Sequence, residues 1–221
     1  MILRGAAAVL AKDARCEVRS KQAITAVLLF AVTSTIAVSF TLGAIGSDTA
    51  VAAALLWVVI YFSAMAGLGR SFAHEEETHT AGLLRLAVPA ESVYIGKLAF
   101  NFLTLVAVEI VAVPMFVLLT GCHIGRAGVF IGLLGLGSLA LSAGATTAAA
   151  MVSRAAGKGA LFAGVSFPLL APALAVAIAG TSAALGPPPH ASAASDVRLL
   201  VYYCGVVIVA SLMLFRYVWE E

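Results

Sequence analysis

Charged side chains are scarce in this chain of 221 residues: Asp, Glu, Lys and Arg make up 11%, whereas 62% of the residues are hydrophobic. A water-soluble domain carries about a quarter of its residues as charged side chains. The scarcity therefore excludes a water-facing surface over most of the chain. The formal net charge of +2 is also too small for the basic patch that binds nucleic acid. We expect a membrane protein with lipid around it and no nucleic-acid partner.

Cysteine and catalytic motifs are scarce as well. The three cysteines show no Cys-x-x-Cys spacing, so neither a disulfide framework nor a zinc ribbon is predicted. No phosphate-binding loop is present, because Gly96-Lys97 and Gly157-Lys158 lack both the earlier glycine and the following Ser or Thr. No GxSxG motif or metal-ligand cluster is found either. We expect a protein that is not an enzyme and that holds no metal.

Long apolar runs are what the chain has in abundance. About 20 mostly apolar residues are needed for a helix to cross a membrane. Six segments meet this length or nearly so: 23–43, 50–69, 98–120, 127–153, 159–180 and 199–215. The sequence therefore predicts an all-α membrane protein with six transmembrane helices, in a single domain over residues 1–221.

The distribution of lysine and arginine predicts the orientation, because these residues are enriched in cytoplasmic loops. With the N-terminus in the cytoplasm, eleven of the 13 basic residues lie inside. They are Arg4, Lys12, Arg15, Arg19, Lys21, Arg70, Arg85, Lys97, Arg154, Lys158 and Arg216. Only Arg126 and Arg198 lie outside. Both termini are expected in the cytoplasm, and residues 181–197 are expected to form an extracytoplasmic loop.

Residues 1–22 predict an amphipathic helix that lies on the cytoplasmic membrane surface. Its basic residues fall within about 80° of one another at 100° per residue, and its apolar residues lie on the other side. The basic residues are Arg4, Lys12, Arg15 and Arg19, and the apolar ones are Ile2, Ala6, Val9 and Leu10. Asp13 and Glu17 interrupt the apolar face.

A polar segment, FAHEEETHTAG at 72–82, separates the second and third predicted spans. Its histidines, His74 and His79, are five apart and so point about 140° apart on a helix, which argues against a shared metal ion. The acidic residues could open a short helix, because a helix N-terminus favours negative charge. Leu83, Leu84 and Leu86 would then be apolar contacts, and Pro89 would end the helix. Two interpretations stay open: a solvated loop, or a helix that docks a cytoplasmic partner.

Glu109 is the one charged residue within a predicted span. An ionised carboxylate at that depth costs several kcal/mol, about 3 on insertion scales, unless it is protonated or paired. Ser34, Thr35 and Tyr61 are candidate partners at similar depth. A structural hydrogen bond and a role in gating or in a substrate path are both open.

Three stretches resemble the CcmB family, the membrane subunits of the cytochrome c maturation ABC transporter. They are AKDARCEVRSKQAITAVLLFAVTS, GRSFAHEEETHTAGLLRLAVPAESVYIGKLAFN and LFRYVWEE. The resemblance implies an ABC-2 type permease in the bacterial inner membrane. Residues 1–22 would be its cytoplasmic connecting helix. Residues 70–91 would hold a coupling helix between spans two and three.

The resemblance further implies a permease subunit that couples ATP hydrolysis by a separate CcmA-like ATPase to haem export, or to release of the haem-loaded chaperone CcmE. CcmC- and CcmD-like membrane proteins and a second permease copy are implied as partners. Haem would be cargo, and ATP would act through the ATPase. The expected coupling residues are Glu75, Glu76, Glu77, Thr78, Leu83 and Leu84, and weak candidates for haem contact are His123 and His190. The alternatives are an ABC-2 exporter of a drug, lipid or polysaccharide, and a proton-coupled transporter that uses Glu109.

Overall fold

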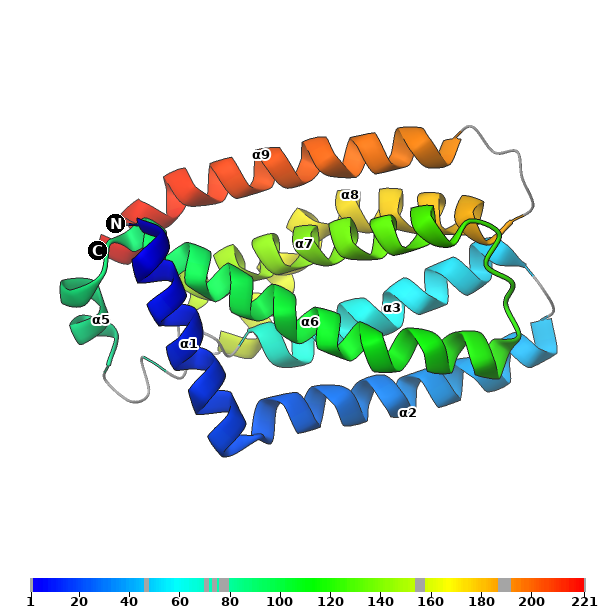
Figure 1. The fold of residues 1–221 in the computed structure, drawn as a ribbon, viewed down its shortest axis with the longest axis horizontal. Helices are drawn as coiled ribbons and strands as arrows, with labels where there is room; N and C mark the ends of the chain where they lie inside the picture. The colour runs from blue at the N-terminus through cyan, green and yellow to red at the C-terminus, as the bar shows by residue number, and fades with distance from the viewer. Residues whose placement is uncertain are drawn as a thin grey trace.

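The computed structural model describes residues 2–45, 48–69, 72, 75, 80–153, 158–186 and 192–220. Within these residues the chain forms eight α-helices, and no strand is found there (Figure 1). They are α1 (Ile2–Ser20), α2 (Gln22–Ile45), α3 (Thr49–Leu68), α5 (Ala81–Ala87), α6 (Ala90–Thr120), α7 (Ala127–Val152), α8 (Lys158–Leu185) and α9 (Ser192–Glu220). The expected all-α architecture is confirmed for this part of the chain.

Six of these helices are long and apolar enough to cross a membrane: α2, α3, α6, α7, α8 and α9. Three of them extend at least five residues beyond one end of the predicted hydrophobic run. α6 begins eight residues earlier than expected, at Ala90. α8 continues to Leu185 and α9 begins at Ser192, so most of the loop expected at 181–197 is helical.

The six long helices lie side by side, and α1 runs across one end of the bundle (Figure 1). Both chain termini and α5 lie at this same end, which we call the terminal end. The opposite end carries the turn from α6 to α7. An even number of crossings places the two termini on the same side of a membrane, in agreement with the charge distribution.

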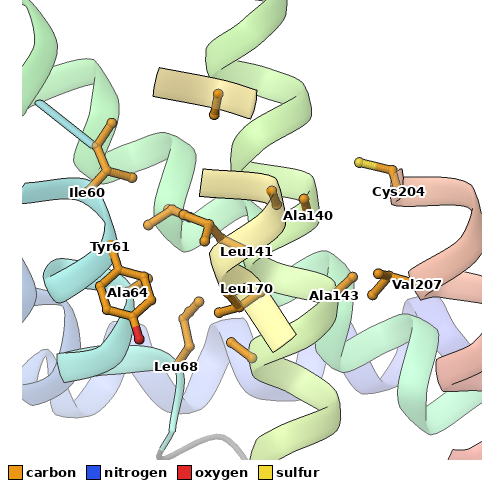
Figure 2. Packing of buried hydrophobic residues seen from close by; sticks show 14 of the residues in the cluster. Ile60, Tyr61, Ala64, Leu68, Ala140, Leu141, Ala143, Leu170, Cys204 and Val207 are labelled. Atoms are coloured by element: carbon orange, nitrogen blue, oxygen red, sulfur yellow. The ribbon is translucent and has the colours of Figure 1, made fainter. Parts of the chain in front are cut away.

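α7 forms the centre of the bundle and packs against α3, α6, α8 and α9. Its small residues allow close approach, which is how helices associate where lipid removes the hydrophobic driving force. At Gly137 the Trp57 ring lies so close that an added Cβ would be 2.0 Å from its Cη2 atom. Leu170 of α8 packs in the same way over Gly144. Figure 2 shows Leu141 and Leu170 between Ile60 of α3 and Val207 of α9.

Polar side chains join the helices inside this core. Trp57 Nε1 donates to Thr181 Oγ1 at 2.9 Å, which links α3 to α8. Asn101 Nδ2 donates to Thr146 Oγ1 at 2.8 Å, which links α6 to α7. Such interhelical hydrogen bonds in membranes contribute about 0.6–2 kcal/mol each.

α1 packs on the bundle through its apolar side. Ala6 and Val9 are buried against the start of α6, where Gly96 leaves room for them. The sequence predicted this helix, but it placed the apolar side in lipid. At the far end of α1, Lys21 adopts a φ of 52°, and the chain turns there into α2. Glu17 stabilises the turn, because its carboxylate accepts a hydrogen bond from the backbone N–H of Ile24 at 2.7 Å.

Candidate functional site

α5 stands apart from the long helices at the terminal end (Figure 1). Thr80 precedes it, and the backbone N–H of Val88 donates to the Leu84 carbonyl at its end. The helix ends at Ala87, two residues before Pro89, which was expected to end it. Leu83 is 69% exposed and Leu86 is 88% exposed. Two exposed leucines on one short helix form an apolar face that is open in the isolated chain.

The predicted coupling residues divide into an exposed and a buried set. Leu83 is exposed, and Leu84 is partly buried against the core. Glu75 is buried, with its side chain only 3% exposed. The remaining three, Glu76, Glu77 and Thr78, lie outside the described residues, as do His74 and His79. The structure therefore separates Glu75 from the open face of α5.

Glu75 belongs to a compact cluster of four charged residues, which we call the Lys97 cluster: Lys12, Asp13, Glu75 and Lys97. Lys97 Nζ lies 2.6 Å from Glu75 Oε1 and 3.1 Å from Asp13 Oδ2. Lys12 Nζ also contacts Glu75 Oε1 and lies 3.0 Å from Asp13 Oδ1. Two cations and two carboxylates balance, and they come from α1, from the segment between α3 and α5, and from α6.

The cluster shifts the pKa values of two of its members, Glu75 and Lys12. Burial works to raise the pKa of Glu75, but the charge of Lys97 and the hydrogen bonds from both lysines outweigh it and hold the pKa below its usual value. Burial works to lower the pKa of Lys12, but the hydrogen bond to Glu75 and the charge of Asp13 leave that pKa raised. Both shifts favour the charged forms of Glu75 and Lys12.

Sequence reasoning missed this cluster, although it noted two of its signs. Asp13 interrupts the apolar side of the first helix, and Lys97 directly precedes an apolar span. The salt bridge between the two residues accounts for both positions, because Asp13 on the buried side of α1 faces Lys97 of α6. An acid on the buried side of one helix and a lysine in the apolar stretch of another are the signal that could have predicted the pair.

An aromatic cluster lies beside the charges and joins the same segment to α9. The Phe72 ring lies 5.7 Å from Phe215 and 5.8 Å from Trp219, centroid to centroid. Lys97 Nζ sits 5.3 Å from the centre of the Phe72 ring, and the Arg85 guanidinium sits 5.0 Å from the Trp219 ring. Cation–π contacts of this kind attach both the segment and α5 to the bundle.

Glu109 is buried in α6, and its partner differs from the three candidates named from sequence. The Ser138 hydroxyl of α7 donates to Glu109 Oε1. Thr35, one of those candidates, is buried but donates instead to the carbonyl of Ala31 within its own helix. The choice among partners depended on which helices are neighbours, which hydropathy does not reveal.

The histidines do not gather into a site in the described part of the chain. His123 is exposed in the link between α6 and α7, at the end of the bundle opposite α5. His190 lies outside the described residues. Among the residues that the structure describes, no group of three His, Cys, Asp or Glu side chains could hold a metal ion.

These features define a multi-pass membrane protein with six spanning helices and an open apolar helix at its terminal end. Residues 4–217 match the family model described as CcmB protein. The match covers nearly the whole chain, so the chain belongs to the CcmB family. No curated protein matches the chain in sequence.

Proposed function

We propose that this chain is the permease subunit of an ABC transporter complex for cytochrome c maturation. In this proposal the fold is that of an ABC-2 type permease in the inner membrane, with the terminal end in the cytoplasm. α1 is the connecting helix, and α5 is the coupling helix. A separate CcmA-like ATPase supplies ATP hydrolysis, which drives haem export or the release of haem-loaded CcmE. CcmC- and CcmD-like proteins and a second permease copy complete the complex.

The observation that carries the proposal is the exposed apolar face of α5. α5, which carries the exposed Leu83 and Leu86, lies at the terminal end, beyond the long helices that lipid would cover. A solvent-exposed leucine pair has no role in folding the isolated chain, and such a patch is typical of a protein-interaction site. An ATPase that receives these leucines explains both their exposure and the lack of a phosphate-binding loop in this chain.

The other predicted residues take different roles in the same proposal. Glu76, Glu77 and Thr78 join the leucines in facing the ATPase. Glu75 instead holds the segment to the bundle, because its carboxylate is buried against two lysines. His123 and His190 are offered as contacts for haem on the extracytoplasmic side.

The test is to replace Leu83 and Leu86 by alanine and to measure how much ATPase copurifies from detergent-solubilised membranes. Each leucine loses about three carbon atoms, or about 2 kcal/mol of apolar burial in a complex. Full burial of both leucines would therefore make the double variant bind about 1,000-fold more weakly. Leu118→Ala is the matched control, because Leu118 is 82% exposed in α6 near the opposite end. Undiminished copurification of the double variant would refute the docking role of α5.

The buried Glu109 favours a second candidate, a proton-coupled transporter that needs no ATPase. A carboxylate inside a spanning helix is a common proton carrier. Measuring cargo movement after ATP depletion separates the two candidates. Transport that persists after ATP depletion but stops in Glu109→Gln supports the proton-coupled transporter. Transport that stops when ATP is depleted supports the ABC permease. An ABC-2 exporter of a drug, lipid or polysaccharide would show ATP dependence with normal c-type cytochromes in a deletion strain.

A further inference from the structure

Three separate parts of the chain meet at Lys97, in the second turn of α6. Its ammonium contacts Glu75 from the segment before α5 and Asp13 from α1, at 2.6 Å and 3.1 Å. The Lys97 side chain is 2% exposed, and those of Glu75 and Asp13 are 3% and 10% exposed. Lys12 lies at the rim of the cluster, with its side chain 42% exposed. Lys97 is therefore the buried centre, and Lys12 is a peripheral member.

Stability alone does not explain a buried ionic centre at this place. Removing charges from water costs about as much as their attraction returns, and apolar replacements of whole buried clusters are often neutral or stabilising. What ionic contacts provide instead is a fixed geometry between the elements that carry them. Here they fix the segment before α5 relative to α1 and α6.

The cluster is connected to α5 through a short path of hydrogen bonds. The backbone N–H of Thr80 donates to the Glu75 carbonyl at 3.0 Å, and the N–H of Leu84 in α5 donates to the Thr80 carbonyl at 3.1 Å. Phe72 on the same segment lies against Lys97 and Phe215. A displacement of α5 would therefore move Glu75 through the backbone hydrogen bonds, and Glu75 would move Lys97 through their salt bridge.

We infer that Lys97 is the positioning residue through which movement of α5 is passed to α1 and α6. The inference rests on the proposed function, because it assumes that an ATPase moves α5. When α5 moves, Glu75 moves with it and displaces Lys97 through their salt bridge. Lys97 in turn displaces Asp13, and with it α1, through the second salt bridge. Close contact between α1 and α6 at Gly96, the residue before Lys97, lets the two helices move together.

The experiment compares the single variants Lys97→Met and Glu75→Gln with the conservative variant Lys97→Arg, in the complete complex. Each of the two single variants is expected to keep bound ATPase and to lower formation of c-type cytochromes by about tenfold, within the usual range of coupling free energies. Lys97→Arg keeps a cation between Glu75 and Asp13, so it should retain most of the function. Arg19→Met is the matched control, because Arg19 is an exposed basic residue of the same helix, α1, outside the Lys97 cluster, and it should leave formation nearly unchanged.

A second readout does not depend on the cargo. Cys16 is exposed on α1, so its rate of labelling by a thiol reagent reports movement of that helix. In the wild-type complex this rate should change when ATP is added, and in Lys97→Met the change should disappear while ATP hydrolysis continues. A merely structural role of Lys97 would lower function only in step with the amount of protein and of bound ATPase, which immunoblotting and copurification would show.

The outcomes separate the inference from the function on which it rests. Normal cytochrome formation and ATP-dependent labelling in both single variants would overturn the role of Lys97 and leave the proposed function standing. Loss of ATPase copurification in step with function would also overturn it, because the cluster would then only shape the docking face. If a gene deletion leaves c-type cytochromes intact, the cargo assignment fails, and the Cys16 labelling still decides the role of Lys97. If the single variants do not fold, ATP-dependent labelling of Cys16 that persists in Lys97→Arg supports the inference, and its absence there overturns it.

Discussion

Replacing Gly96 by alanine should force α1 away from α6. The new Cβ would lie 2.7 Å from Val9 Cβ and 2.8 Å from the backbone oxygen of Ala6. Carbon atoms in contact are normally about 3.5–4.0 Å apart. α1 must therefore move by about 1 Å, because no rotamer change can displace a backbone oxygen. The move also stretches the 3.1 Å contact between Asp13 and Lys97.

The size of the effect follows from two opposing contributions. Overfilling a packed contact costs about 1–3 kcal/mol. Alanine is better than glycine within a helix by up to about 1 kcal/mol. We expect a net loss of about 1–2 kcal/mol, or a decrease in Tm of about 2–8 °C for a chain of this size. Gly135→Ala in α7 is the control, because nothing lies within 4 Å of its Cβ position.

Thermal unfolding of the two purified variants in detergent measures the difference directly. Gly96→Ala should melt below the wild type, and Gly135→Ala should melt at or slightly above it. Equal melting temperatures for the two variants would refute the close contact between α1 and α6, and with it the route from α5 to α1.

Three other predictions concern buried polar groups. Glu109→Gln keeps an acceptor for the Ser138 hydroxyl, so folding and cytochrome formation should persist; loss of function with unchanged melting would instead favour a proton carrier. Glu75→Gln should lower unfolding free energy by up to about 3 kcal/mol at pH 7, because it breaks the buried pair with Lys97. The pKa of Glu75 is lowered from 4.5 in the folded state, so the stabilisation by the ionised carboxylate is present above pH 4.5 and is lost as the pH falls below it. A difference in unfolding free energy between Glu75→Gln and the wild type that does not narrow in acid would contradict the pairing. Thr181→Val removes the hydrogen bond from Trp57 with little change in side-chain volume and should cost about 1 kcal/mol in a melting curve, and an unchanged curve would mean that the bond contributes nothing.

The six spanning helices could be predicted because lipid imposes a simple rule of length and apolarity on each of them. The rule failed at helix ends. The first two turns of α6 contain Glu91 and Lys97, so hydropathy excluded them, yet they are helical because α1 covers them. α9 likewise begins among Asp196 and Arg198, which no apolar run would include.

The candidate site was harder to predict, because its members are distant in sequence. The leucines of α5 could be named from the local pattern, and the structure places Leu83 on an open face. In the sequence, Glu75 is one of three consecutive glutamates, a pattern typical of an exposed surface. Its burial depends on Lys12 and Lys97, which lie 63 and 22 residues away. Pairing across such separations depends on helix arrangement, which no local pattern contains.

The most direct test of the proposed function is a haem stain of denatured membrane proteins from cells with and without this gene. Covalently attached haem survives denaturation, so the stain reports c-type cytochromes. We predict that the stained bands disappear in the deletion strain and return when the gene is restored. Bands that persist in the deletion strain would contradict a role in cytochrome c maturation.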